Sequence, residues 1–506
     1  MSDLLEMLYE RYNQFGYYEY PIHNPYTLIK ILREGDISKN KLEEKIREYE
    51  ICEKISHGFN DFHELVEGKN FVQPKSVVIR LYYLDLILNS LPEYFYRDLR
   101  ICKEEIMSMT VAVVMYYMGL NVYKYGKVPI TATMRRNIVG REDCYFGLQE
   151  MQKVCGKISA ETYSRYLDIF ARDINKIKEQ DSVKLYMYDE KPFILCMTDY
   201  LDYVMHEIER LFKEQYLEKE YSKYMNIKGN AFEELVFNVI KPFFEECYHT
   251  LYYYPGHKEK IELDIVTRNN REMAIIECKS GTIWFEQAVD DAAVKGTIKN
   301  SVKKAYKSLL KVAEHCAEEK GYCFENEDIK LWGTNEMPIC MHVSMYPLDF
   351  IASNIHTLFP EYIVNKKNPV LSISFEHLCA ILLDLREKDK SIFEYWKKRR
   401  TDILKYPEVR FDNNELDLYY ELIMDSRDSM LTQIKEQGIL DMMAPNVSIL
   451  STFRNENGYE ERPAFSMLKH LDSIWIANIF AYGKSWMGLN KRYLKNLEEA
   501  MEIKEN

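Results

Sequence analysis

Three consecutive strand-like segments between residues 250 and 280 limit the fold of this chain more than any other feature. They read TLYYYPG, IELDIVTR and EMAIIECKS, and each is rich in the β-branched, aliphatic and aromatic residues typical of strands. A helical pattern, NIKGNAFEELVFNVIKPFFEE, precedes them, and a lysine-rich one, TIKNSVKKAYKSLLKVAEHCAEE, follows. Two further strand-like segments are IKLWGT and PICMHVSM. This order predicts an α/β core in which helices flank a central mixed sheet.

Helical patterns on both sides of this core predict three regions in the 506-residue chain. Residues 1–185 show mostly helical spacing, as in VVIRLYYLDLILNSL, and Ser159 is a candidate N-cap of the helix that follows it. Residues 186–350 contain the core. Residues 351–506 return to helical patterns such as FEHLCAILLDLREK. We therefore expect a mostly helical N-terminal domain that acts as a sensor, partner-binding region or scaffold, an α/β core, and a helical C-terminal extension.

Charge and cysteine content restrict the class of protein. The net charge of −13 disfavours a general nucleic-acid coat protein, although the acidic excess lies almost wholly outside residues 225–320. The 11 cysteines form no CxxC pair, which favours free thiols in a reducing compartment. The first residues lack the pattern of a signal peptide, and no apolar run approaches the roughly 20 residues that span a bilayer. We therefore expect a cytoplasmic protein with no membrane partner.

Carboxylates and a lysine interrupt the two central strands. A hairpin that closes on the asparagine pair at 269–270 would place Asp264 opposite Ile275. Because side chains alternate along a strand, Asp264, Glu277 and Lys279 would then share one face. Asp264 and Glu277 become diagonal neighbours, roughly 7–8 Å apart at the backbone. Two such carboxylates can hold a hard divalent cation, and Lys279 can polarise a bound water or offset phosphate charge.

The same segments resemble a known family. KGNAFEELV, ELDIV and IIECKSG resemble the first helix and the second and third strands of the PD-(D/E)XK nuclease superfamily, which has the restriction-endonuclease-like fold. The spacing is most similar to the Mrr-like and NERD-like branch. The resemblance covers residues 228–320 and implies nothing about residues 1–180.

The resemblance also implies roles for individual residues. Asp264 and Glu277 would be metal ligands, the Cys278 carbonyl would complete the metal shell, and Lys279 would be the catalytic lysine. Glu233 would be the helix glutamate of the motif, a catalytic-site residue that orders a metal-bound water or a second ion. The implied cofactor is Mg²⁺, for which Mn²⁺ would substitute.

The two helices beside the strands leave alternatives open. Glu234 also fits the pattern of the helix acid, although the phase of the apolar stripe favours Glu233. A further polar residue of the site would come from the downstream helix, with the candidates Gln287, Lys303, Lys304 and Tyr306. Helically spaced lysines on that helix would bind nucleic acid or form a solvated face: Lys299, Lys303, Lys304 and Lys307. The segment YWKKRR at 395–400 has the same two interpretations.

The implied activity is that of a Mg²⁺-dependent endonuclease acting on DNA, in restriction or antiphage defence. The sequence contains no GxxxxGK[ST] loop, so translocation driven by a nucleotide would require a separate ATPase or sensor subunit of such a system. We expect a homo-oligomer or a hetero-complex. Two alternatives are a catalytically silent nuclease-fold subunit serving assembly or nucleic-acid binding, and a nuclease directed at RNA. For Glu277 and Lys279 themselves, the alternative is a structural ion pair on an edge strand.

Overall fold

The chain divides into two compact units, and the division falls inside helix α12 (Glu218–Ile240), between Tyr224 and Met225. Unit 1 holds the described residues up to Tyr224 together with Asp472, and unit 2 holds those from Met225 to Leu471. The sequence placed boundaries after residues 185 and 350 instead. The computed structural model describes, apart from isolated positions and short stretches, residues 75–125, 145–178, 181–256, 259–281, 305–316, 322–333, 336–346, 350–358, 368–405 and 415–423.

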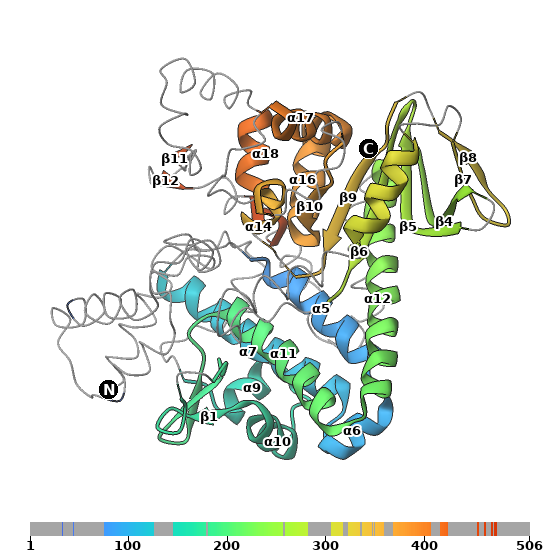
Figure 1. The fold of residues 1–506 in the computed structure, drawn as a ribbon. Helices are drawn as coiled ribbons and strands as arrows, with labels where there is room; N and C mark the ends of the chain where they lie inside the picture. The colour runs from blue at the N-terminus through green and yellow to red at the C-terminus, as the bar shows by residue number, and fades with distance from the viewer. Residues whose placement is uncertain are drawn as a thin grey trace. The chain divides into compact units, whose positions relative to one another are not determined.

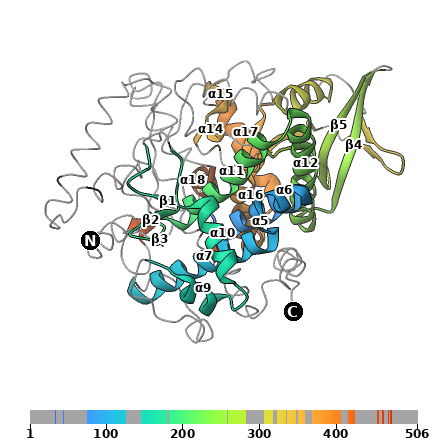
Figure 2. The ribbon, with the colours of Figure 1, turned by 90° about the horizontal axis from the view of Figure 1, so that it is seen from below.

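The described part of unit 1 is built mainly from helices. They are α5 (Val77–Ser90), α6 (Glu93–Leu99), α7 (Lys103–Tyr125), α9 (Leu148–Val154), α10 (Ala160–Phe170) and α11 (Met197–Gln215), and α7, α10 and α11 lie side by side (Figures 1 and 2). Ser159 caps α10, as the sequence predicts, by accepting a hydrogen bond from the Thr162 N–H at 3.0 Å. A small three-stranded sheet contains β1 (Arg172–Asp173), β2 (Tyr186–Tyr188) and β3 (Lys191–Phe193).

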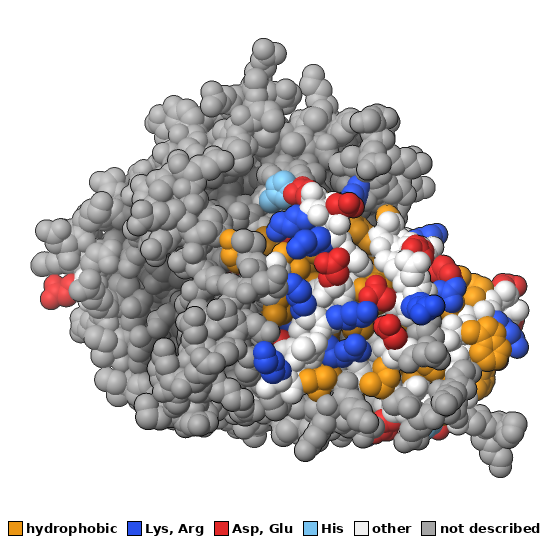
Figure 3. All heavy atoms as spheres, turned by 90° about the horizontal axis from the view of Figure 1, so that it is seen from above, with side chains coloured by type: hydrophobic (Ala, Val, Ile, Leu, Met, Phe, Trp, Pro, Cys, Tyr) orange, Lys and Arg blue, Asp and Glu red, His pale blue; other side chains and the backbone are white. Residues whose placement is uncertain are grey.

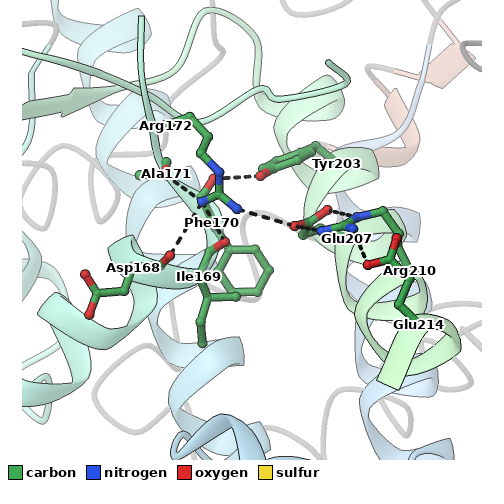
Figure 4. Close-up of polar contacts among 9 residues, drawn as sticks. All are labelled: Asp168, Ile169, Phe170, Ala171, Arg172, Tyr203, Glu207, Arg210 and Glu214. Atoms are coloured by element: carbon green, nitrogen blue, oxygen red, sulfur yellow. Dashed lines mark hydrogen bonds and ion pairs between the residues drawn. The ribbon is translucent and has the colours of Figure 1, made fainter. Parts of the chain in front are cut away.

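Polar contacts close the C-terminal end of α10 and connect it to α11 (Figure 4). Arg172 Nη1 donates to the Ile169 carbonyl at 3.1 Å, and the Tyr203 hydroxyl donates to the Phe170 carbonyl at 2.7 Å. Glu207 of α11 lies 3.8 Å from Arg172 Nη2. These bonds satisfy carbonyl groups that the end of a helix leaves without a helical partner. We therefore interpret this network as structural.

Unit 2 is centred on a seven-stranded mixed sheet with the order β10-β9-β6-β5-β4-β7-β8. Strands β6, β9 and β10 pair in parallel, and the remaining neighbours are antiparallel. The mixed α/β sheet flanked by helices is therefore confirmed. The strand bounds are β4 (Glu246–Gly256), β5 (Glu259–Asn269), β6 (Glu272–Lys279), β7 (Cys323–Glu325), β8 (Lys330–Trp332), β9 (Ile339–Ser344) and β10 (Leu371–Ser374).

Helices cover both faces of the central strands. Phe237 of α12 stacks on His249 of β4, with ring centroids 5.3 Å apart. The helix at residues 305–316 packs on the alternate row of side chains, where the Cys340 thiol donates to the Leu309 carbonyl. Burial on both faces explains why β6 and β9 read as nearly continuous apolar runs. The described part of unit 2 also contains α14 (Phe350–Ser353), α15 (Ile355–Leu358), α16 (Phe375–Glu387), α17 (Ile392–Lys405) and α18 (Glu415–Ile423).

The segment YWKKRR lies on α17 and is largely structural. Trp396 and Arg399 are buried, and the Arg399 guanidinium lies 3.0 Å from Glu415 and 3.3 Å from Asp402. Both earlier interpretations, a nucleic-acid contact and a solvated helix end, are therefore wrong for the buried Trp396 and Arg399, whereas Lys397, Lys398 and Arg400 are partly exposed and both interpretations stay predictions for them. Among the described helices of both units, none combines the length and the apolar character needed to cross a membrane.

Candidate functional site

The β5–β6 hairpin brings the predicted polar residues together, but in a different register from the predicted one. The ladder starts with Asn269 opposite Glu272. Continued along the strands, this register brings Asp264 opposite Glu277, whereas the sequence placed it opposite Ile275. The predicted register is therefore wrong by two residues. A shift of two keeps every side chain on its predicted face, so the shared face of the carboxylates and the lysine is retained.

Asp264, Glu277 and Lys279 converge where the pairing of β5 with β6 ends. Lys279 Nζ lies 3.0 Å from Glu277 Oε2 and 3.8 Å from Asp264 Oδ2. The backbone N–H of Cys278 donates to Asp264 Oδ2 at 2.7 Å and so fixes that carboxylate. The Glu277 side chain is only 6% exposed, whereas Lys279 is 28% exposed. Solvent therefore reaches the cluster from the side of the lysine, and an edge-strand ion pair does not describe it.

Helix α12 contributes an acid to this cluster. Burial raises the pKa of Glu233 to about 7, and the negative charge of Asp264 adds to the effect. Glu234 is exposed. The acid that faces the strands is therefore Glu233, as the helical phase predicts. The helix passes close to the end of β6 at Gly229, where an added Cβ would contact Ser280 Oγ at 3.7 Å.

Burial and like charge dominate the electrostatics of the cluster. The pKa of Glu277 is raised to about 8. Burial is the largest cause, and the negative charge of Asp264 is the second. Burial also raises the pKa of Asp264 above its ordinary value. For Lys279, burial disfavours the charged form, but Glu277 and Asp264 outweigh it and the pKa lies above its ordinary value. At neutral pH the cluster therefore keeps a charged lysine and favours a proton on Glu277.

The strand opposite Asp264 is strained. Thr250 has φ 56°, and the pairing of β4 with β5 passes from His249–Ile265 to Leu251–Leu263, so Thr250 lies across from Asp264. A left-handed conformation is a genuine outlier for a β-branched residue and costs on the order of 1–3 kcal/mol. The regular ladder is thus interrupted beside the one aspartate of the cluster.

A buried histidine was missed by the sequence analysis. His342 of β9 pairs in register with Glu277, and its Nδ1 lies 2.9 Å from the Ser372 hydroxyl of β10. Burial, aided by the positive charge of Lys279, lowers its pKa to about 3, so the imidazole is neutral. Its Nε2 is buried without a hydrogen-bond partner in the described structure. The signal was a polar residue inside the apolar run PICMHVSM, the same kind of signal that identified Glu277.

The lysine-rich helix is described only in part. Lys299, Lys303, Lys304 and Gln287 lie outside the described residues. Lys307 is exposed, Lys311 forms an ion pair with Glu259, and the Tyr306 ring lies 5.9 Å from that of His342. On the face drawn in Figure 3, positive and negative side chains alternate over the described surface. A nucleic-acid contact through Lys307 stays a prediction.

The donor chemistry of the cluster fits a hard divalent cation. Among the residues that the structure describes, no three Asp, Glu, His or Cys side chains form a ready-made metal-binding group. Asp264 and Glu277 nevertheless offer opposed carboxylates, the donors that Mg²⁺ prefers. Burial, followed by the charge of Asp264, raises the pKa of Glu277, and a cation between the two carboxylates would favour their charged forms. The role of the Cys278 carbonyl stays a prediction.

The cluster thus combines two opposed carboxylates, an ammonium group and a helix acid at the end of a strand pair. Such a set can bind a cation, neutralise an anionic group and exchange a proton near neutral pH. Known protein families, curated proteins and solved structures give no match to this chain.

Proposed function

We propose that unit 2 is a metal-dependent endonuclease that hydrolyses phosphodiester bonds of DNA. The observation that carries the proposal is the contact of Lys279 with both Glu277 and Asp264, at 3.0 and 3.8 Å, where the β5–β6 ladder ends. A structural ion pair requires only one carboxylate. A second buried carboxylate beside the first costs stability, and such an arrangement is common where function requires it.

Each residue of the cluster has a role that follows from its environment. Asp264 and Glu277 would hold Mg²⁺ or Mn²⁺, which supplies an activated water and stabilises negative charge on the phosphoryl group. Lys279, protonated and partly exposed, would orient the attacking water and neutralise a phosphate oxygen. Glu233, with a pKa of about 7, would accept a proton near neutral pH.

The choice of DNA, and of restriction or antiphage defence as the setting, rests on the resemblance to PD-(D/E)XK nucleases. A separate ATPase or sensor subunit, and a homo-oligomeric or hetero-complex assembly in the cytoplasm, belong to the same proposal.

A second candidate function is a nuclease-fold subunit that binds nucleic acid without cleaving it. The specific observation in its favour is that Lys279 already neutralises part of the charge on both carboxylates. In this case the cluster would be a structural remnant, and substitution of Glu277 would leave the biological activity intact.

The proposal is tested by nicking of supercoiled plasmid DNA in Mg²⁺, in Mn²⁺ and in EDTA. We expect nicking in either metal and none in EDTA, and a loss of about 10²–10³-fold or more in Asp264→Asn and Lys279→Met, because each removes electrostatic stabilisation at the reacting phosphate. Glu234→Gln is the matched control, because that acid lies on the same helix and is exposed. Wild-type rates in both cluster variants would refute the proposal. Cleavage of RNA in place of DNA would change the substrate but not the site.

A further inference from the structure

The outer part of the sheet in unit 2 exposes large aromatic side chains. Only four large hydrophobic side chains in the described chain are markedly exposed, and two of them, Tyr254 at 45% and Trp332 at 59%, lie on β4 and β8. Hydrophobic side chains are also visible at the right-hand edge of Figure 3, over these outer strands. Burying such a side chain contributes about 1.5–3 kcal/mol, so an exposed pair marks a surface that gains by being covered.

The strand register places Tyr252 and Trp332 on one side of the sheet, and the exposed Tyr254 lies on β4 where the pairing with β5 shifts in register. Tyr252 pairs with Glu262 of β5 and with Glu325 of β7, and Glu325 pairs with Lys330 of β8. Trp332 is two residues beyond Lys330 and so points the same way. The residues between them, Phe324 and Leu331, are buried on the other side. We call Tyr252, Tyr254, Trp332, Lys260 and Lys330 the aromatic strip.

The aromatic strip is continuous with the candidate site along β5. Lys260, Glu262 and Asp264 are alternate residues and share one side of that strand. The Lys260 ammonium lies 3.4 Å from the centre of the Tyr252 ring, and Glu262 is close enough to Glu233 to raise its pKa. At about 3.3 Å per residue, the four residues from Asp264 to Lys260 span roughly 13 Å.

The hairpin that carries Trp332 is firmly anchored. The Gly333 N–H donates to the Tyr322 carbonyl at 2.8 Å, and a Cβ on Gly333 would come within 2.0 Å of the Tyr322 ring. Glycine is therefore required directly after Trp332. A backbone held in place at Trp332 reduces the conformational entropy lost on binding.

The chemistry of the strip favours bases over phosphates as its ligand. Exposed aromatic rings stack on nucleobases with little sequence preference. The charges are mixed, because Lys330 lies 3.3 Å from Glu325 and Glu262 is exposed, so a contact dominated by phosphate neutralisation is disfavoured. Base pairing in a duplex hides the faces of the bases, whereas an unpaired strand presents them.

We propose that the aromatic strip binds unpaired bases of a single-stranded segment of nucleic acid. The next part of the inference rests on the proposed function. The same strand of nucleic acid would continue along β5 to Asp264 and Lys279. The substrate class is then a strand with an unpaired region next to the cleaved bond. Stacking is common to DNA and RNA, so the strip itself does not select between the two sugars.

The test is fluorescence anisotropy of labelled oligonucleotides with the full chain in EDTA, where cleavage does not interfere. Single-stranded oligo-dT, oligo-U and a duplex of the same length are compared for wild type, Trp332→Ala, Trp332→Phe and Tyr254→Ala. Leu217→Ala is the matched control, because Leu217 is 76% exposed and belongs to unit 1.

We expect tighter binding of single strands than of the duplex, and a loss of about 5- to 100-fold for single strands in Trp332→Ala. Trp332→Phe should retain most of the affinity, and Leu217→Ala all of it. The affinity should fall only weakly with salt, with a log–log slope of about −1.5 or shallower for two lysine contacts. Equal binding of duplex and single strand, no binding at all, or full affinity in Trp332→Ala would overturn the proposal. The binding assay contains no metal and is independent of cleavage, so single-strand binding here together with no plasmid nicking in Mg²⁺ or Mn²⁺ would uphold the strip while the proposed nuclease activity fails.

Discussion

Replacing Glu277 by glutamine should stabilise the metal-free protein, although Glu277 belongs to the proposed site. The pKa of this carboxyl rises from 4.5 to about 8 on folding. A carboxyl whose pKa is raised on folding binds its proton more tightly in the folded state. Below pH 4.5 it is protonated in both states and costs nothing. As the pH rises toward 8, ionisation in the unfolded state draws the equilibrium toward unfolding.

The size of the effect follows from the pKa values. One pKa unit corresponds to about 1.4 kcal/mol, so the cost of Glu277 to folding at pH 7 is about 3 kcal/mol. The side chain is 6% exposed, so solvent screening reduces this value little. Glutamine has the same shape and no titrating proton, but Lys279 loses one of its two charged partners. We therefore expect Glu277→Gln to gain about 1–3 kcal/mol at pH 7 and little at pH 5.

The assay is urea unfolding in EDTA at pH 5, 6, 7 and 8. Hydrogen exchange of the amides in residues 272–279 assigns the relevant transition to unit 2, because the chain has two units that need not unfold together. Glu234→Gln serves as the exposed control and should have no comparable effect. A lower stability of Glu277→Gln at pH 8, or a difference that stays constant from pH 5 to pH 8, would refute the reasoning.

Two further predictions concern backbone strain and capping. Thr250→Gly should raise stability by about 1 kcal/mol, because glycine adopts φ 56° without steric cost; a loss in urea unfolding would contradict the strain. Asp472→Asn should lower the thermal stability of unit 1 by about 1–2 kcal/mol, because Asp472 accepts hydrogen bonds at the start of α5 from the Ser76 hydroxyl at 2.5 Å and from the Val77 N–H at 3.1 Å. An unchanged melting temperature, with exposed Asp168→Asn as the control, would contradict the role of this cap.

Much of the sheet and of the site is predictable from local pattern. The two central strands, β8 and β9 follow from runs of apolar residues, and Ser159 is identifiable as a cap because its hydroxyl suits an N-terminus. The faces of Asp264, Glu277 and Lys279 follow from alternation alone. Alternation is insensitive to a shift of two residues. The predicted face of these side chains was therefore right, although the predicted register of β5 with β6 was wrong.

The missed features depend on tertiary contacts. In the turn between β5 and β6, Asn270 takes the left-handed conformation, with φ 52°. Asn269 could equally have taken it, so the sequence did not determine the register of β5 with β6. β7 and β10 are only three and four residues long, and neither was predicted as a strand from the sequence. His342 becomes part of the cluster only through the parallel pairing of β9 with β6, which brings together residues far apart in the sequence.

The central claim is that Asp264 and Glu277 together hold a divalent cation. The most direct measurement is a crystal structure of the full chain soaked in Mn²⁺, with anomalous diffraction recorded at the manganese edge. We predict one anomalous peak in contact with both carboxylates, at about 2.0–2.3 Å from the nearest oxygens, and no peak there in Asp264→Asn crystals. A soaked wild-type crystal in which Lys279 still bridges the two carboxylates and the anomalous map is empty around them would contradict the claim.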